Sequence, residues 1–235
     1  MILKKILRRC SLFFNKGLSI AIKNYQYLDE DSKYLHILEA INYVRVAGNN
    51  GQIIPAVYFE FGCHSGRTFS SAINAFNCLG MVQAEAYAFD SFEGLPPTSS
   101  INDGIFEKGS FSTDVKNFKN IVRKNTGKIL NNSNIIKGFY SESLTQSLQS
   151  KLPKAGIVHI DVDLYTSTKE VLSFVYPLLV SGTVILFDDW YCFPPDQSKG
   201  EMGAFNEFCL ENPRFKVIPW KAYSSFGQSF FVVAI

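Results

Sequence analysis

The amino-acid sequence predicts an α/β protein with a mainly parallel β-sheet that helices cover on both faces. Two observations lead to this fold class. Short apolar segments alternate along the chain with segments of helical periodicity. Four of the apolar segments end in acidic residues, which are Glu60, Asp90, Asp161 and the pair Asp188-Asp189. In a parallel sheet the carboxyl ends of the strands form one ligand-binding edge, so the acids are expected to meet there.

The first half of the chain supplies the first helices and strands of this pattern. Leu35, Leu38, Ile41 and Val44 recur at helical spacing, and a Gly-Asn-Asn-Gly turn ends that helix. We expect helices at residues 34–46, 65–79 and 113–125, and strands at residues 57–61, 84–89 and 134–137.

The second half continues the alternation and ends differently. We expect strands at residues 156–160 and 183–187, helices at residues 167–179 and 201–211, and a terminal pair of strands at residues 215–220 and 230–235. Two connecting segments, residues 91–112 and 192–200, flank the acidic strand ends in the sequence. Either segment is a candidate lid that excludes water from a site.

Composition limits the classes of protein that the chain belongs to. Of its 235 residues 46% are hydrophobic and 19% are charged, which is enough for a buried core. A net charge of +2 is too small to indicate a nucleic-acid partner. The five cysteines are odd in number and form no CxxC pair, so neither a disulfide framework nor a zinc site is expected, and a cytoplasmic location fits best.

The N-terminal 50 residues are expected to form a helical extension, and residues 51–235 the main domain. Residues 1–25 contain six basic residues and no acidic one, with apolar residues between them. The charges interrupt the apolar run, so it is too short to span a bilayer. It is expected to be an amphipathic helix. Such a helix packs on its own domain or on a second subunit of a homo-oligomer, or it contacts the inner face of the membrane peripherally.

The turn after the first predicted strand has features of a cofactor site. Glu60, Gly62 and Gly66 give the pattern E-x-G-x-x-x-G, which differs from the GxGxxG of dinucleotide-binding turns. The glycines allow the backbone to approach a ligand, and an acid ahead of them suits a cationic ligand amine. Asp90 ends the next strand, where Rossmann-like folds place an acid on ribose hydroxyls.

Asp161, Asp188 and Asp189 end two strands that we expect to be neighbours. Three adjacent carboxylates repel one another, and a hard divalent cation such as Mg²⁺ would relieve that repulsion. The alternative is that each acid only caps a helix. Asp163 fits either role. His159 precedes this cluster, and a structural role is favoured for it over a catalytic one.

These residues resemble the TylF/MycF (macrocin-type) O-methyltransferases over about residues 57–227. The matching stretches are Phe59-Glu60-Phe61-Gly62 with Gly66, Phe89-Asp90-Ser91-Phe92-Glu93-Gly94-Leu95-Pro96, Gly109-Ser110-Phe111, Lys137-Gly138-Phe139-Tyr140, Ile160-Asp161-Val162-Asp163-Leu164-Tyr165 with Ser167-Thr168, Tyr176-Pro177, and Asp188-Asp189-Trp190 with Gly200-Glu201. Trp190 stands where the family often has tyrosine, which leaves the acids unchanged but alters the expected substrate pocket.

The resemblance implies a Rossmann-like class I methyltransferase with a seven-stranded sheet and an antiparallel C-terminal strand. It implies S-adenosylmethionine as methyl donor, and Mg²⁺ or another hard divalent cation held by Asp161, Asp188 and Asp189. Asp161 would also be the catalytic base. The cofactor-binding residues implied by position are Glu60, Phe61, Gly62, Cys63, Ser65, Gly66, Asp90, Ser91, Gly138, Phe139 and Asp161.

The implied reaction transfers a methyl group to a hydroxyl of a small-molecule or lipid-linked sugar, in a natural product, a glycolipid or a polysaccharide. Three alternatives stay open at the level of the sequence. They are a methyltransferase that acts on a catechol-like phenol, a nicotinamide-dependent oxidoreductase, and a non-catalytic protein of the membrane surface. The missing GxGxxG pattern and the double aspartate disfavour the oxidoreductase.

Overall fold

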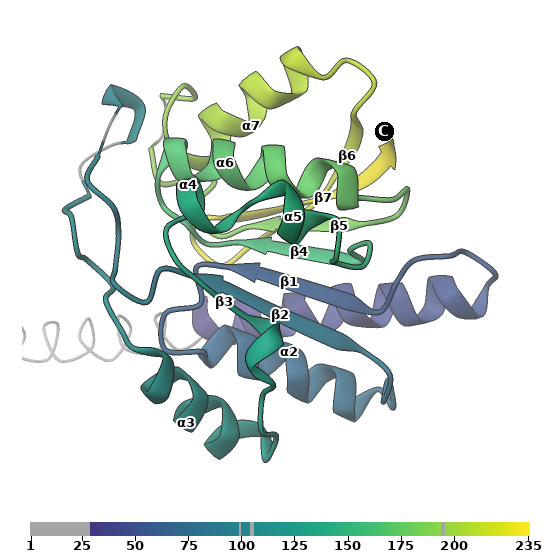
Figure 1. Cartoon of the computed structure of the whole chain (residues 1–235). Helices are drawn as coiled ribbons and strands as arrows, with labels where there is room; N and C mark the ends of the chain where they lie inside the picture. The colour runs from purple at the N-terminus through teal and green to yellow at the C-terminus, as the bar shows by residue number, and fades with distance from the viewer. Residues whose placement is uncertain (1–28, 99, 104–105, 194–195) are drawn as a thin grey trace, which may run out of the picture.

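The computed structural model describes residues 29–98, 100–103, 106–193 and 196–235 (Figure 1). The basic segment of residues 1–25, and the membrane contact predicted for it, lie outside the described residues. Within the described part of the chain, no helix has the length and apolar composition needed to cross a bilayer.

The described strands form one seven-stranded sheet in the order β3-β2-β1-β4-β5-β7-β6. Strands β1 to β5 pair in parallel, and β7 runs antiparallel to both of its neighbours, β5 and β6. The predicted mainly parallel sheet with an antiparallel C-terminal strand is therefore confirmed. The strands are β1 Val57–Phe61, β2 Glu85–Asp90, β3 Ile135–Lys137, β4 Ile157–Ile160, β5 Val184–Phe187, β6 Lys216–Tyr223 and β7 Gly227–Ala234.

Helices cover both faces of the sheet, as predicted. A helix that runs through residues 29–49, here called the N-terminal helix, lies with α2 and α3 on one side, and α4 to α7 lie on the other (Figure 1). The labelled helices are α2 Arg67–Cys78, α3 Val115–Thr126, α4 Tyr140–Ser143, α5 Gln146–Gln149, α6 Tyr165–Val175 and α7 Gly200–Glu211. Single 3-10 turns occur at Ile101–Asp103, Asn132–Asn134 and Tyr176–Leu178. The sequence did not predict α4 and α5, because four residues are too few to show helical periodicity.

Strand alternation divides the core between the two faces. On β1, Tyr58 packs with the N-terminal helix and α2, whereas Phe59 and Phe61 pack with α6 and its neighbours. Ile37 and Ile41 of the N-terminal helix are fully buried in the first of these clusters. Residues 29–49 thus share a hydrophobic core with the sheet. The boundary expected at residue 50 stays a prediction.

Local signals explain where the elements begin and end. Asp114 caps α3 by accepting a hydrogen bond from the backbone N–H of Asn117 at 2.8 Å, and Gly127 ends the same helix with a φ of +71°. All five residues of β1 are buried, as are all four of β4 and of β5. Strands buried on both faces are typical of the centre of a parallel sheet, and here Glu60 on β1 and His159 on β4 are the polar exceptions to its apolar composition.

Candidate active site

A cavity of about 780 Å³ opens at the carboxyl ends of β1, β2, β4 and β5. A volume of this size is typical of sites for small molecules and cofactors. Most of the predicted site residues line it. Those residues are Gly62, Asp90, Ser91, Gly138, Phe139, Asp161, Asp188 and Asp189. The cavity therefore lies at the edge of the sheet where the acidic residues at the strand ends predict a ligand site.

Gly62 lies where the end of β1 approaches both β2 and β4 at this edge of the sheet. Its φ is +81°, and a Cβ on it would lie 1.7 Å from the backbone oxygen of Asp161. Its N–H donates to the backbone oxygen of Phe89 at 2.9 Å, while the N–H of Asp161 donates to that of Phe61 at 2.9 Å. Only glycine permits both this conformation and this close approach of β1 to β4.

Asp90 holds the glycine-containing turn in place. One of its oxygens, Oδ2, accepts the N–H groups of Cys63 and His64 at 2.7 and 2.8 Å. The other, Oδ1, accepts the N–H of Phe92 at 2.6 Å. Asp90 also lines the cavity. It therefore fixes the turn between β1 and α2 in addition to the ribose role predicted from the sequence.

Five of the predicted cofactor residues do not line the cavity. Phe61, Cys63 and Gly66 are buried, and Ser65 is partly exposed. Phe61 points into the core on the α6 side of the sheet. These residues shape the turn behind the cavity wall.

Glu60, for which the sequence predicts contact with a ligand amine, is also outside the lining of the cavity. Its side chain is fully buried, and its Oε2 accepts the hydroxyl of Tyr58 at 2.5 Å. As a strand residue with Tyr58 as its i−2 neighbour, it faces the N-terminal helix rather than the cavity. Its other oxygen, Oε1, is buried without a hydrogen-bond partner among the described residues, and the contact with a ligand amine stays a prediction.

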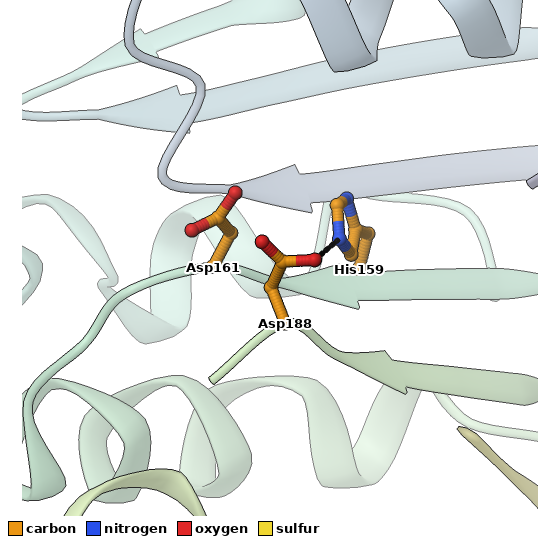
Figure 2. Close-up of side chains that lie close together, drawn as sticks. All are labelled: His159, Asp161 and Asp188. Carbon is orange, nitrogen blue, oxygen red and sulfur yellow. Dashed lines mark ion pairs between the residues drawn. The ribbon is translucent and has the colours of Figure 1, made fainter. Parts of the chain in front are cut away.

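The acidic strand ends meet at a histidine. Atoms of His159, Asp161 and Asp188 lie within 4.8 Å of one another, and Asp188 lies between the other two in Figure 2. His159 Nε2 and Asp188 Oδ1 face each other 3.8 Å apart, which is too long for a hydrogen bond, and neither buried atom has a hydrogen-bond partner among the described residues. Buried polar atoms without such a partner are rare in folded proteins.

The charges of this group influence one another strongly. Burial and the charge of Asp188 raise the pKa of Asp161 well above its usual range. Burial also acts to raise the pKa of Asp188, but His159 and Lys33 outweigh it and lower that pKa. Burial alone would lower the pKa of His159, yet the carboxylates of Asp188 and Glu60 raise it to about 9. In its protonated form, His159 forms ion pairs with Glu60 Oε2 at 3.7 Å and with Asp188 Oδ1 at 3.8 Å.

Lys33 is a site residue that the sequence reasoning missed. It lies on the N-terminal helix, lines the cavity and forms an ion pair with Asp188 Oδ2. Its Nζ is also 3.9 Å from Asp161 Oδ2. Lys33 precedes Ile37 by four residues and Ile41 by eight, so a lysine in line with the buried stripe was the available signal.

Asp189 turns toward a second set of polar groups. Its Oδ1 accepts the thiol of Cys192 at 3.0 Å. Its backbone N–H donates to Glu201 Oε2 at 2.9 Å, and Glu201 Oε1 accepts the N–H of Val162 at 3.2 Å. The fully buried Glu201 thus joins the loops that follow β4 and β5.

Asp163, which the sequence left ambiguous, lines the cavity. It has a φ of +59°, which is uncommon outside glycine and often accompanies ligand sites. Burial and the charge of Asp189 raise its pKa to about 8. The helix-capping role considered for it is not present, because residue 164 is the cap of α6.

The two predicted lid segments both lie near the cavity and touch each other. Asp103 is fully buried, and its Oδ1 accepts the N–H and the hydroxyl of Thr166, each at 2.9 Å. This anchors the loop of residues 91–112 to the start of α6. Phe106 of that loop and Phe193 of the second segment have ring centroids 6.0 Å apart in an edge-to-face contact.

The seven-stranded sheet with antiparallel β7, and the cavity at the carboxyl ends of its parallel strands, are the architecture of class I S-adenosylmethionine-dependent methyltransferases. Residues 32–208 match the model of the TylF family, macrocin-O-methyltransferase. The chain therefore belongs to that family and is an S-adenosylmethionine-dependent O-methyltransferase. This membership confirms the predicted resemblance and decides against the oxidoreductase and the non-catalytic protein.

Solved structures share the fold at low sequence identity. The O-methyltransferase NovP has a TM-score of 0.69 at 18% identity, over 86% of this chain and 80% of its own. CalS11, a calicheamicin methyltransferase, has a TM-score of 0.62 at 16% identity, over 84% and 78% of the two chains. TomG from Streptomyces achromogenes has a TM-score of 0.54 at 11% identity, over 83% and 80%. No curated protein matches the sequence.

Proposed function

We propose that this enzyme transfers the methyl group of S-adenosylmethionine to a hydroxyl of a sugar, and that a divalent cation assists the transfer. The observation that carries the metal requirement is that the carboxylates of Asp161, Asp188 and Asp189 line one cavity, with atoms of Asp161 and Asp188 within 4.8 Å of each other. The sugar belongs to a natural product, a glycolipid or a polysaccharide.

The donor set fits a hard cation. Asp161, Asp188 and Asp189 line the same cavity and offer carboxylate oxygens, which Mg²⁺ prefers. When bound, the cation lowers the pKa of a coordinated hydroxyl and orients it for reaction. His159 lies beside Asp188 and lowers its pKa, which favours the ionised carboxylate that a cation needs.

Residues on the other side of the cavity would hold the cofactor, which supplies an activated methyl group on a sulfonium. Gly62 and Gly138 expose backbone there, and Asp90 keeps lone pairs free on a carboxylate already fixed by backbone N–H groups. Ser91 and Phe139 complete this wall. Rigid positioning of donor and acceptor contributes much of the rate in such displacements.

Asp161 is the proposed base that takes the proton from the acceptor hydroxyl. It lies at the end of β4 between the cofactor wall and Asp188.

Support for a sugar acceptor comes from the relatives. The family takes its name from macrocin O-methylation. CalS11 is described as a TDP-rhamnose 3'-O-methyltransferase in calicheamicin biosynthesis. An acceptor with adjacent hydroxyls also suits a cavity in which carboxylates and one ammonium group lie side by side.

The test measures methyl transfer from labelled S-adenosylmethionine to nucleotide-linked, lipid-linked and aglycone-linked sugars, with a catechol as the comparison acceptor. We expect transfer to a sugar that stops after EDTA treatment and returns with Mg²⁺. Asp161→Asn should abolish transfer and keep the affinity for S-adenosylhomocysteine. Asp114→Asn, which changes the cap of α3, is the matched control and should stay active. Full activity in excess EDTA would overturn the metal requirement, and transfer to the catechol alone would overturn the sugar acceptor.

A further inference from the structure

The proposed cation site already contains a positive charge that belongs to the chain. The Lys33 ammonium forms an ion pair with Asp188 Oδ2 and lies 3.9 Å from Asp161 Oδ2. These are the two carboxylates that form the cluster with His159 at the cavity. Lys33 therefore neutralises the oxygens that a divalent cation would use.

The N-terminal helix that carries Lys33 is held to the sheet by contacts away from the cavity. Glu39 pairs with Lys221 of β6, with Nζ 2.8 Å from Oε2. His36 Nε2 is hydrogen-bonded to Ser229 of β7 at 2.8 Å. Because these contacts do not involve the carboxylates, the Lys33 side chain is free to leave Asp188 while the helix stays in place.

Lys33 has room to move. Its side chain is 22% exposed and borders the cavity of about 780 Å³. The long, unbranched lysine stem allows the ammonium to reorient into that space. A divalent cation and an ammonium cannot share the oxygens of Asp188, because like charges at ion-pair distance repel strongly in a partly buried site.

We propose that Lys33 is a tethered counter-ion, which occupies the cation position of the metal-free enzyme and is displaced when a divalent cation binds Asp161 and Asp188. The inference rests on the proposed function. Without metal, the Lys33 ammonium offsets the repulsion between the two carboxylates. Only the molecules in which Lys33 has left the site can bind metal, so the apparent metal affinity falls in proportion to that fraction.

Calorimetric titration of the full-length protein with MgCl₂, without cofactor or acceptor, tests the competition. Lys33→Met should bind Mg²⁺ about ten-fold more tightly than the wild type, if Lys33 occupies the site in about nine molecules of ten. Lys33→Arg keeps the charge and should stay close to the wild type. Lys221→Met removes the ion pair with Glu39 on the same helix and is the matched control, with unchanged affinity.

Labelling of lysines with an amine-reactive reagent, read by mass spectrometry, tests the displacement itself. In the wild type, Lys33 should be protected without metal and become several-fold more reactive with MgCl₂. Lys221 should react equally in both states. Unchanged reactivity of Lys33 would overturn the displacement, even if Lys33→Met tightened Mg²⁺ binding through reduced repulsion alone.

The outcomes separate this inference from the proposed function. Equal Mg²⁺ affinity of the wild type and Lys33→Met overturns the inference and leaves the metal requirement intact. Binding by Lys33→Met but not by the wild type would mean that the cation does not displace Lys33, which overturns both the displacement and the metal requirement. Absence of Mg²⁺ binding in both proteins overturns both.

Discussion

The two halves of the ligand-binding edge are built on opposite principles. At the ends of β1 and β2, Asp90 is satisfied by three backbone N–H groups and fixes the turn around Gly62. At the ends of β4 and β5, Asp188 depends on side chains instead, because its Oδ1 is 3.8 Å from His159 Nε2 and its Oδ2 pairs with Lys33. Glu60 Oε1 and Asp188 Oδ1 are both buried without a hydrogen-bond partner among the described residues, so the contrast is between Asp90, which the backbone satisfies, and Asp188, which charged side chains surround.

The difference shows how to separate a structural acid from a ligand-binding one. Both kinds end a parallel strand, so their positions in the sequence are equivalent. What distinguishes them is whether the chain itself supplies enough donors. Substitutions in the two halves should therefore produce different patterns of loss.

Asp188→Asn should give the largest effect on activity. Removal of this carboxylate takes away a proposed cation ligand and the partner of both Lys33 and His159. We expect kcat/KM to fall about 1000-fold, or roughly 4 kcal/mol of transition-state stabilisation. The affinity for S-adenosylhomocysteine, measured by calorimetry, should change by less than about three-fold, within the scatter expected for a site without direct contact. A comparable loss of cofactor affinity would show that the two halves are not separate.

Asp90→Ala should give the reverse pattern at intermediate size. It leaves three backbone N–H groups without their acceptor, and the free energy of unfolding should fall by about 2–3 kcal/mol. Affinity for S-adenosylhomocysteine should fall about ten-fold or more, because the Gly62 turn loses its support. Mg²⁺ affinity should not change. Asp114→Ala, which removes the acceptor of a single N–H on α3, is the control and should cost about 1 kcal/mol in the same denaturant titration.

Lys137→Met should give the smallest effect. Lys137 lies at the end of β3 beside the cofactor half, and its Nζ is 3.3 Å from Glu93. Both side chains are more than half exposed, at 52% and 58%. An exposed pair of this kind contributes no more than about 0.5 kcal/mol. Thermal unfolding, cofactor affinity and Mg²⁺ affinity should all match the wild type, and a clear loss in any of them would give the Lys137 side chain a role that its exposed ion pair does not predict.

The order of strands and helices was predictable because burial imposes patterns on the sequence. The strand predicted at residues 57–61 has the observed bounds of β1, since its apolar run ends at Gly62. The sequence predicts that the helix after β4 starts at Ser167. In the structure α6 starts two residues earlier, at Tyr165. The cap residue of α6 is Leu164, whose side chain makes no capping hydrogen bond, so the sequence contains no Ser, Thr, Asp or Asn that marks this helix start.

The site was predictable where function depends on strand ends and not where it depends on side-chain direction. Asp161, Asp188 and Asp189 line the cavity as predicted. Glu60 does not, because alternation along β1 directs it toward the N-terminal helix. Lys33 is 155 residues from Asp188, and no local pattern connects two residues at that distance. The structural role favoured for His159 stays a prediction, and its partner Glu60, which lies on another strand, leaves no local pattern in the sequence either.

Gly62 links the site to the way the chain folds. With the backbone oxygen of Asp161 where its Cβ would be, it sets how closely the first and second halves of the sheet meet. Any side chain at this position would separate β1 from β4, and the hydrophobic core would open together with the cavity. The active site therefore assembles when β1 pairs with β4. A substitution at Gly62 should disturb both the sheet and the site, and stabilising substitutions elsewhere in the core would not restore the site.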